Sequence, residues 1–151
     1  GERRMSEPAA GAPITVEHLL EAMRFLDDWE DRYRFIMDLG KKLPPMPDDE
    51  KTDDNFVHGC QSRVWVSLRE SSGSTSPVVL HADSDAFIVK GLAAMVVVLV
   101  AGRSAREIVG FDIESVFDEL GLHEHLSPTR SNGLHGMIKQ VRERAALLAA
   151  S

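Results

Sequence analysis

Cys60 is the only cysteine of the 151-residue chain and the side chain best suited to nucleophilic chemistry. It lies in the segment Asn55-Phe-Val-His-Gly-Cys-Gln-Ser62, between a proline-rich stretch and an expected strand, which predicts a loop or strand-edge position. A thiolate can attack a sulfur atom directly, and it needs access more than it needs a catalytic base. Position alone supports two interpretations equally, a buried structural cysteine and a reactive thiol.

The two residues before the cysteine bear on this choice. Gly59 has no side chain and can adopt backbone angles closed to other residues, so the backbone or sulfur of another molecule can approach closely. His58 would share a face with Cys60 in an extended strand, where it could help to deprotonate the thiol. A half-exposed loop histidine without a catalytic part is the commoner case, and both interpretations of His58 stay open.

Two histidines, His123 and His125, stand one residue apart and suggest a metal pair. No further ligand with suitable spacing lies in the same segment, and Cys60 is remote in sequence. We therefore predict a solvated helix end here and no metal site. Ser/His/Asp catalysis is poorly supported as well, because the chain has no Gly-x-Ser-x-Gly motif.

Other charged residues have ordinary structural interpretations. Asp83 and Asp85 precede a long apolar segment, which predicts helix N-caps and leaves acid catalysis a distant second. Arg130 lies in Ser127-Pro-Thr-Arg-Ser-Asn-Gly133, a predicted turn before the last helix. There its guanidinium can pair with a carboxylate of this chain or of a partner.

Composition excludes several classes of function. The formal net charge of -7 argues against non-specific binding to nucleic acid, which depends on Lys and Arg neutralising phosphates. The longest apolar run, residues 92–101, is short of the roughly 20 residues that cross a bilayer, so we expect no membrane span. A single cysteine excludes an internal disulfide, and no leading segment has the pattern of a signal peptide. We expect a cytoplasmic protein.

The patterning of the chain predicts one domain over residues 14–151, preceded by a flexible tail over residues 1–13. Thr15 and one of Asp27 or Asp28 can cap two helices that form a hairpin, the second ending in a left-handed turn at Gly40. Residues 44–55 are rich in proline and acidic side chains, and we expect an exposed connection there.

After this connection, the spacing of the apolar residues changes from a helical repeat to the two-residue repeat of a strand. Apolar residues alternate over residues 63–69 and return at 77–81 after a turn at 71–76, which predicts a strand hairpin. A largely apolar helix follows at about 86–101, then shorter helices from Ser104 and over 112–120, and a last helix over 134–150. This order predicts an α+β fold with one small antiparallel sheet covered by helices.

Several motifs, in this order, resemble the SufE family of sulfur-acceptor proteins, and the resemblance covers residues 25–148. They are Trp29-Glu-Asp-Arg-Tyr-Arg-Phe-Ile, Leu39-Gly-Lys-Lys-Leu-Pro, Gly59-Cys-Gln-Ser-Arg-Val-Trp65, Asp83-Ser-Asp-Ala, Ile88-Val-Lys-Gly-Leu92 and His125-Leu-Ser-Pro-Thr-Arg-Ser-Asn-Gly-Leu134. The resemblance implies the α+β fold that SufE proteins share with IscU-type scaffolds.

The resemblance also implies a function. Cys60 would accept persulfide sulfur from a SufS-type cysteine desulfurase, stimulate that enzyme and deliver sulfur to a downstream iron–sulfur scaffold. The desulfurase carries the pyridoxal phosphate, so this chain is expected to need no cofactor of its own and to act as a sulfur-transfer partner rather than a stand-alone enzyme. Gln61, Asp83 and Arg130 are expected near the docking surface or in support of the cysteine loop, together with His58 and Gly59.

Two alternatives remain at this point. An IscU-type scaffold has the same overall fold, but it uses three cysteines to hold a cluster and this chain has one. A plain adaptor would activate the desulfurase by docking alone, with Cys60 serving only as packing. We favour a sulfur carrier whose proline-rich connection and Gly59-Cys60 turn let the sulfur retreat against apolar neighbours and swing out toward a partner.

Overall fold

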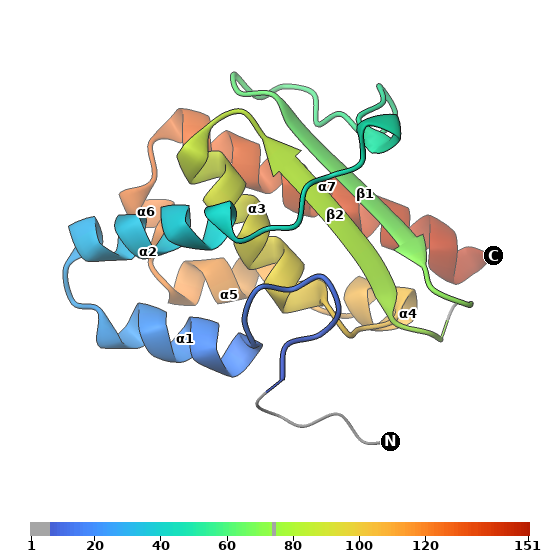
Figure 1. Cartoon of the computed structure of the whole chain (residues 1–151), viewed down its shortest axis with the longest axis horizontal. Helices are drawn as coiled ribbons and strands as arrows, with labels where there is room; N and C mark the ends of the chain where they lie inside the picture. The colour runs from blue at the N-terminus through green and yellow to red at the C-terminus, as the bar shows by residue number, and fades with distance from the viewer. Residues whose placement is uncertain (1–6, 74) are drawn as a thin grey trace.

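The computed structural model of the chain describes residues 7–73 and 75–151, and it shows a strand hairpin lying beside a set of helices (Figure 1). The elements in chain order are α1 (Val16–Phe25), α2 (Trp29–Lys41), the 3-10 turn η1 (Asp48–Glu50), β1 (Val64–Glu70), β2 (Val78–Ser84), α3 (Phe87–Val100), α4 (Ala105–Val109), α5 (Ile113–Glu119), α6 (Leu122–His125) and α7 (Pro128–Ala150). The predicted α+β class, with a small antiparallel sheet and helices around it, is confirmed.

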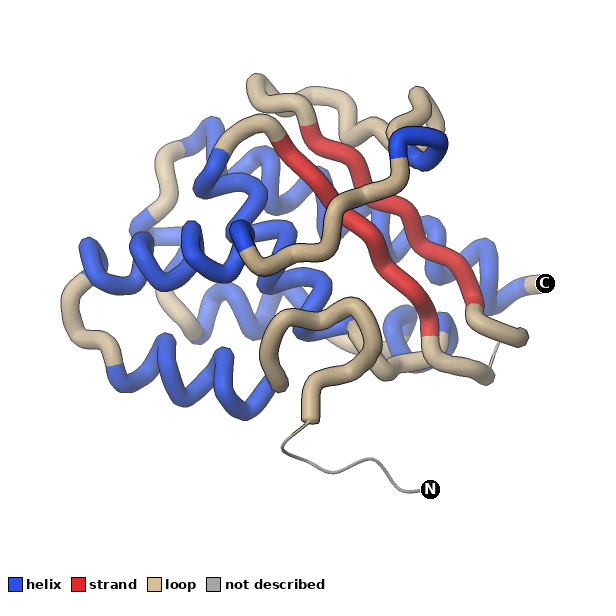
Figure 2. Tube along the Cα trace, in the orientation of Figure 1, coloured by secondary structure: helices blue, strands red, loops and turns tan. Residues whose placement is uncertain are grey.

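The sheet is an antiparallel pair in which Val64 lies opposite Ser84 and Glu70 opposite Val78. Along β1 and β2 every second side chain is buried, as the two-residue period of the sequence predicts. The helices α3 and α7 pack against this hairpin. The tube view in Figure 2 shows the chain between α2 and η1 passing in front of both strands.

That crossing segment is mostly exposed, as expected over residues 44–55, but it is also fastened to the rest of the chain. Met46 is buried at 4% exposure, and a carboxylate oxygen of Glu50 lies 2.9 Å from Nδ1 of His81 on β2. The prolines keep the segment irregular, and one apolar side chain among them is buried. The connection is therefore fastened at several points before it reaches the cysteine.

Helix α3 is the centre of the core, with almost all of its side chains buried. It crosses α2 where two glycines meet: a Cβ atom at Gly40 would lie 2.7 Å from the backbone nitrogen of Gly91. A Cβ atom at Gly91 would lie 2.3 Å from the carbonyl oxygen of Ile36. The prediction of a left-handed helix end at Gly40 was wrong, because this glycine lies inside α2 and allows the close helix crossing.

Helix ends follow the predicted caps in some places and not in others. Thr15, Asp28 and Asp112 cap α1, α2 and α5, and Ser104 forms the predicted capping box with Glu107. The predicted N-cap role of Asp83 was wrong, since β2 runs on to Ser84. The cap residue of α3 is Ala86, whose side chain accepts no hydrogen bond and whose N–H donates to Oγ of Ser84 over 3.2 Å, so Asp85 does not cap this helix either.

The start of the last helix also differs from expectation. Helix α7 begins at Pro128 rather than near residue 134, because Ser127 caps it and proline fits the first helical position. Arg130 is therefore in the first turn of a helix and not in a loop. Of the expected tail, residues 1–6 lie outside the described part, and Ala12 packs against the core. Within the described residues, no helix combines the length and apolar character that crossing a membrane requires.

The contact of α2 with α3 gives a test of the fold. We expect Gly91→Ala to lower the free energy of unfolding by about 2 kcal/mol or more, because the new methyl group meets backbone that cannot turn aside. Gly110→Ala is the matched control, since its Cβ atom would meet nothing nearer than 3.9 Å. Urea unfolding of both variants measures the difference, and equal midpoints would show that the helices do not cross so closely.

Candidate functional site

The cysteine loop, residues 58–63, joins a short extended segment to the start of β1. At its base the N–H of Val57 donates to the carbonyl of Val64 over 2.8 Å, and the N–H of Val66 donates to the carbonyl of Asn55 over 2.9 Å. These bonds continue the antiparallel pairing of the sheet by one short stretch. Cys60 lies at the tip of the resulting hairpin, in the loop position that its sequence context predicts.

Gly59 adopts a φ of +88° in the turn before Cys60. A Cβ atom there would contact nothing within 4 Å, so the backbone angle rather than the space requires glycine. The contacts of His58 are with other residues: Nε2 lies 3.6 Å from Oδ1 of Asp53, and the ring meets Phe56 edge-on. The prediction that His58 and Cys60 share one face of an extended strand was wrong, because residues 58 and 59 form a turn.

The sulfur of Cys60 lies against two glycines of α7, Gly133 and Gly136. Cβ atoms at Gly133 and Gly136 would lie 3.8 Å and 3.6 Å from Sγ, and one at Gly136 would also lie 2.9 Å from Cγ1 of Val57. The thiol is half-buried in this position, and burial raises the pKa of Cys60 above its ordinary value. In this conformation the sulfur is sheltered and held in its neutral form.

A groove of about 570 Å³ opens beside the cysteine loop, where the loop meets the starts of α3 and α7. Its apolar residues include Phe87, whose side chain is 72% exposed. Gln61 and Arg130 supply polar groups, and within the described residues the guanidinium of Arg130 has no hydrogen bond or ion pair. The full lining is Met37, Gln61, Ser62, Ala86, Phe87, Ile88, Val89, Ser127, Thr129 and Arg130.

Asp83 does not line this groove, and its contacts lie within the chain. Its carboxylate oxygens are 2.9 Å from Nζ of Lys51 and 3.4 Å from Nζ of Lys90. Burial acts to raise the pKa of Asp83, but the two ammonium groups and the N–H of Ser84 outweigh it and hold that pKa below its ordinary value. Asp83 thus links the connection, β2 and α3 within the chain.

Sequence reasoning missed the surface against which the sulfur rests. The last helix was expected to begin after Gly133, so the two glycines did not stand out as one helical face. Their spacing of three residues was the available indication. His123 and His125, which were not expected to form a metal pair, are separated: the His125 ring stacks on Trp29 at 4.1 Å, whereas His123 faces Glu114 on α5.

The glycine face of α7 predicts how the sulfur can be released. We expect the methyl group of Gly136→Ala to crowd Val57 and to raise the free energy of the closed loop position by about 1 kcal/mol. The population of molecules with an exposed sulfur would then rise about fivefold. Gly133→Ala is the control, because its Cβ atom meets only ordinary contacts and brings the same gain in helix propensity. The rate of Cys60 alkylation by iodoacetamide at one pH measures exposure. Equal rates in the two variants would contradict this account of the shelter.

The fold and sequence have known counterparts. An uncharacterised SufE-like protein of Rhizobium etli is 42% identical over 138 residues, covering 91% of this chain and 93% of the relative. An uncharacterised SufE-like protein of Rhizobium meliloti is 40% identical over 132 residues, covering 87% of this chain and 94% of the relative. Both relatives therefore match nearly the whole domain.

A solved structure and a family description agree with them. The solution structure of a hypothetical protein from Thermus thermophilus matches with a TM-score of 0.73 and 22% identity, covering 93% of this chain and 99% of the other. At that identity the likeness shows the fold alone. The SufE family profile, described as an Fe-S metabolism associated domain, matches residues 17–145. The chain therefore belongs to the SufE family, whose domain is associated with iron–sulfur metabolism.

Proposed function

We propose that Cys60 accepts sulfane sulfur from a SufS-type cysteine desulfurase and delivers it for iron–sulfur cluster assembly. The observation that supports this best is the position of the only cysteine, at the tip of a loop, half-buried and beside an open groove. In the transfer the Cys60 thiolate attacks the outer sulfur of the donor persulfide. The donor's sulfur–sulfur bond breaks, its cysteine leaves as a thiolate, and Cys60 becomes a persulfide.

The sheltered position of the sulfur fits a carrier that must also expose it. A neutral, half-buried thiol reacts slowly, and a persulfide in the same place is protected from stray thiols and oxidants. Transfer requires the loop to open, and opening restores an ordinary thiol pKa because it removes the desolvation. The closed position of the loop thus protects the sulfur, and the open position allows it to react.

The bonding of the loop supports such movement. Its far end is fastened at Arg63, whose N–H donates to Oδ1 of Asp85 over 3.0 Å and whose carbonyl accepts from the N–H of Asp85. Between Val57 and Arg63, no backbone hydrogen bond ties the loop to the other described residues. The loop can therefore rotate between two fixed points without breaking the sheet.

The groove is the surface that we assign to the desulfurase. An exposed aromatic side chain next to an unengaged guanidinium is typical of binding surfaces, because it offers apolar area and a charge-assisted donor together. Phe87 and Arg130 provide this pair directly beside Gln61 and the cysteine loop. The pyridoxal phosphate belongs to the desulfurase, and the sulfur recipient is an iron–sulfur scaffold in the cytoplasm.

The central test asks whether sulfur becomes covalently attached to Cys60. After incubation of the full chain with desulfurase, cysteine and pyridoxal phosphate, we expect intact mass spectrometry to show added sulfur on the wild type and none on Cys60→Ser. Sulfide release by the desulfurase in the presence of a reductant is measured alongside. If Cys60→Ser stimulated that release as fully as the wild type, the chain would be an adaptor and the thiol only packing.

The docking surface is tested separately. We expect Arg130→Glu to weaken desulfurase binding by about tenfold, since a repulsive charge replaces a favourable one at the contact. The control is Arg106→Glu, an exposed arginine on α4 that does not line the groove. Alkylation of Cys60 should proceed at the wild-type rate in both variants. Unchanged binding by Arg130→Glu would remove the groove from the docking surface.

A further inference from the structure

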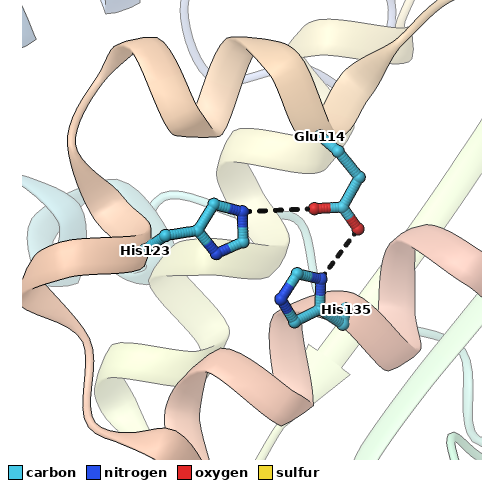
Figure 3. Close-up of side chains that lie close together, drawn as sticks. All are labelled: Glu114, His123 and His135. Atoms are coloured by element: carbon cyan, nitrogen blue, oxygen red, sulfur yellow. Dashed lines mark hydrogen bonds and ion pairs between the residues drawn. The ribbon is translucent and has the colours of Figure 1, made fainter.

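A second group of reactive side chains lies where three short segments meet on the helical side of the molecule. Figure 3 shows Glu114 of α5, His123 of α6 and His135 of α7 pointing toward one another. Nδ1 of His135 is 2.9 Å from Oε1 of Glu114, and Nε2 of His123 is 3.4 Å from Oε2. One ligand-type atom from each residue lies within 4.8 Å of the others. We call this group the Glu–His cluster.

One feature of the cluster is costly for a protein without a bound ion. Oε2 of Glu114 is buried and accepts no hydrogen bond from the described residues, and a buried carboxylate oxygen normally has a partner. The two imidazole rings are stacked, with centroids 4.6 Å apart and an angle of 17° between their planes. Their nitrogens are therefore close together, and one ring has to turn before both in-plane lone pairs point at a single ion.

We propose that the Glu–His cluster binds one zinc ion. Zinc prefers neutral imidazole nitrogens and carboxylate oxygens at about 2.0–2.2 Å, which in a tetrahedron stand roughly 3.3–3.6 Å apart. The ligands are Nε2 of His123, Nδ1 of His135 and the carboxylate of Glu114, the atoms that already face one another. Rotation of the side chains, with one imidazole leaving the stack, would bring the three ligand atoms to one ion, and there is room for it because Glu114 is 31% exposed and His135 is 45% exposed.

The surroundings favour zinc over the common hard cations. Calcium and magnesium take mostly oxygen ligands, and two of the three groups here are imidazoles. A further carboxylate oxygen near the cluster is Oδ1 of Asp118, which lies 2.8 Å from Nε2 of His123. The Asp118 side chain is 60% exposed. Asp118 or a water molecule can therefore fill the fourth position. A site of three protein ligands and one exchangeable ligand is a normal zinc arrangement.

Zinc at this position would connect α5, α6 and α7. His135 lies between Gly133 and Gly136, the two residues whose backbone supports the sulfur of Cys60. The ion therefore stabilises the same turn of α7 that shelters the thiol. This role does not depend on sulfur transfer, and it can be tested on the chain alone.

The test uses the full chain after removal of metal with a chelator, titrated with zinc chloride in a calorimeter. We expect one zinc ion per chain. The variants Glu114→Gln, His123→Gln and His135→Gln should each weaken binding by about tenfold or more, at least the effect of losing a residue that only orients a ligand. Matched controls are Glu119→Gln, on the same helix as Glu114, and His18→Gln, an exposed histidine on α1. Both should bind zinc as the wild type does.

A spectroscopic measurement on the unmodified chain guards against variants that fail to fold. Zinc should shift the ring nitrogen resonances of His123 and His135 and leave those of His18 and His58 unchanged. Absence of saturable one-to-one binding would overturn the proposal, as would full binding by a His123→Gln, His135→Gln double variant. Loss of binding in Cys60→Ser would also overturn it, because the ion would then sit on the thiol.

Discussion

Helix α3 has no polar face, and the rest of the fold is arranged to cover it. Helices α1, α2 and α7 and strand β2 all pack against it, so that its side chains are almost completely removed from water. This burial requires the close passage of α2, which is possible only because Gly40 and Gly91 have no side chains. The start of α3 is the exception: Phe87 emerges at the surface, where the loop and α7 also begin.

The proposed function places two opposite physical demands on the cysteine. A sulfur nucleophile reacts as an anion, and an anion is stable in water; a stored persulfide is stable only where water and other thiols are kept out. The chain meets both demands with a hairpin loop that has fixed ends and a weakly bonded middle. In the closed position the sulfur lies against the glycine face of α7, so no separate lid is needed.

Much of this fold could be predicted from local sequence, because local physics determines it. Alternating apolar residues indicated the strands, and capping side chains such as Asp28 and Ser104 indicated helix starts. The position of Cys60 in a loop also followed from its neighbours. Predictions failed where residues distant in sequence decide the outcome. Gly40 meets another helix, and Asp83 meets two lysines, so neither acts as the helix terminus or cap that its local context indicates.

One bonding detail links the groove to the thiol. Asp85 holds the far end of the cysteine loop through both its side chain and its backbone, and Phe87 follows two residues later at the exposed start of α3. Only one residue separates that aromatic ring from the anchor of the loop. A partner that docked as proposed on Phe87 would therefore act next to the residue that holds the hairpin closed.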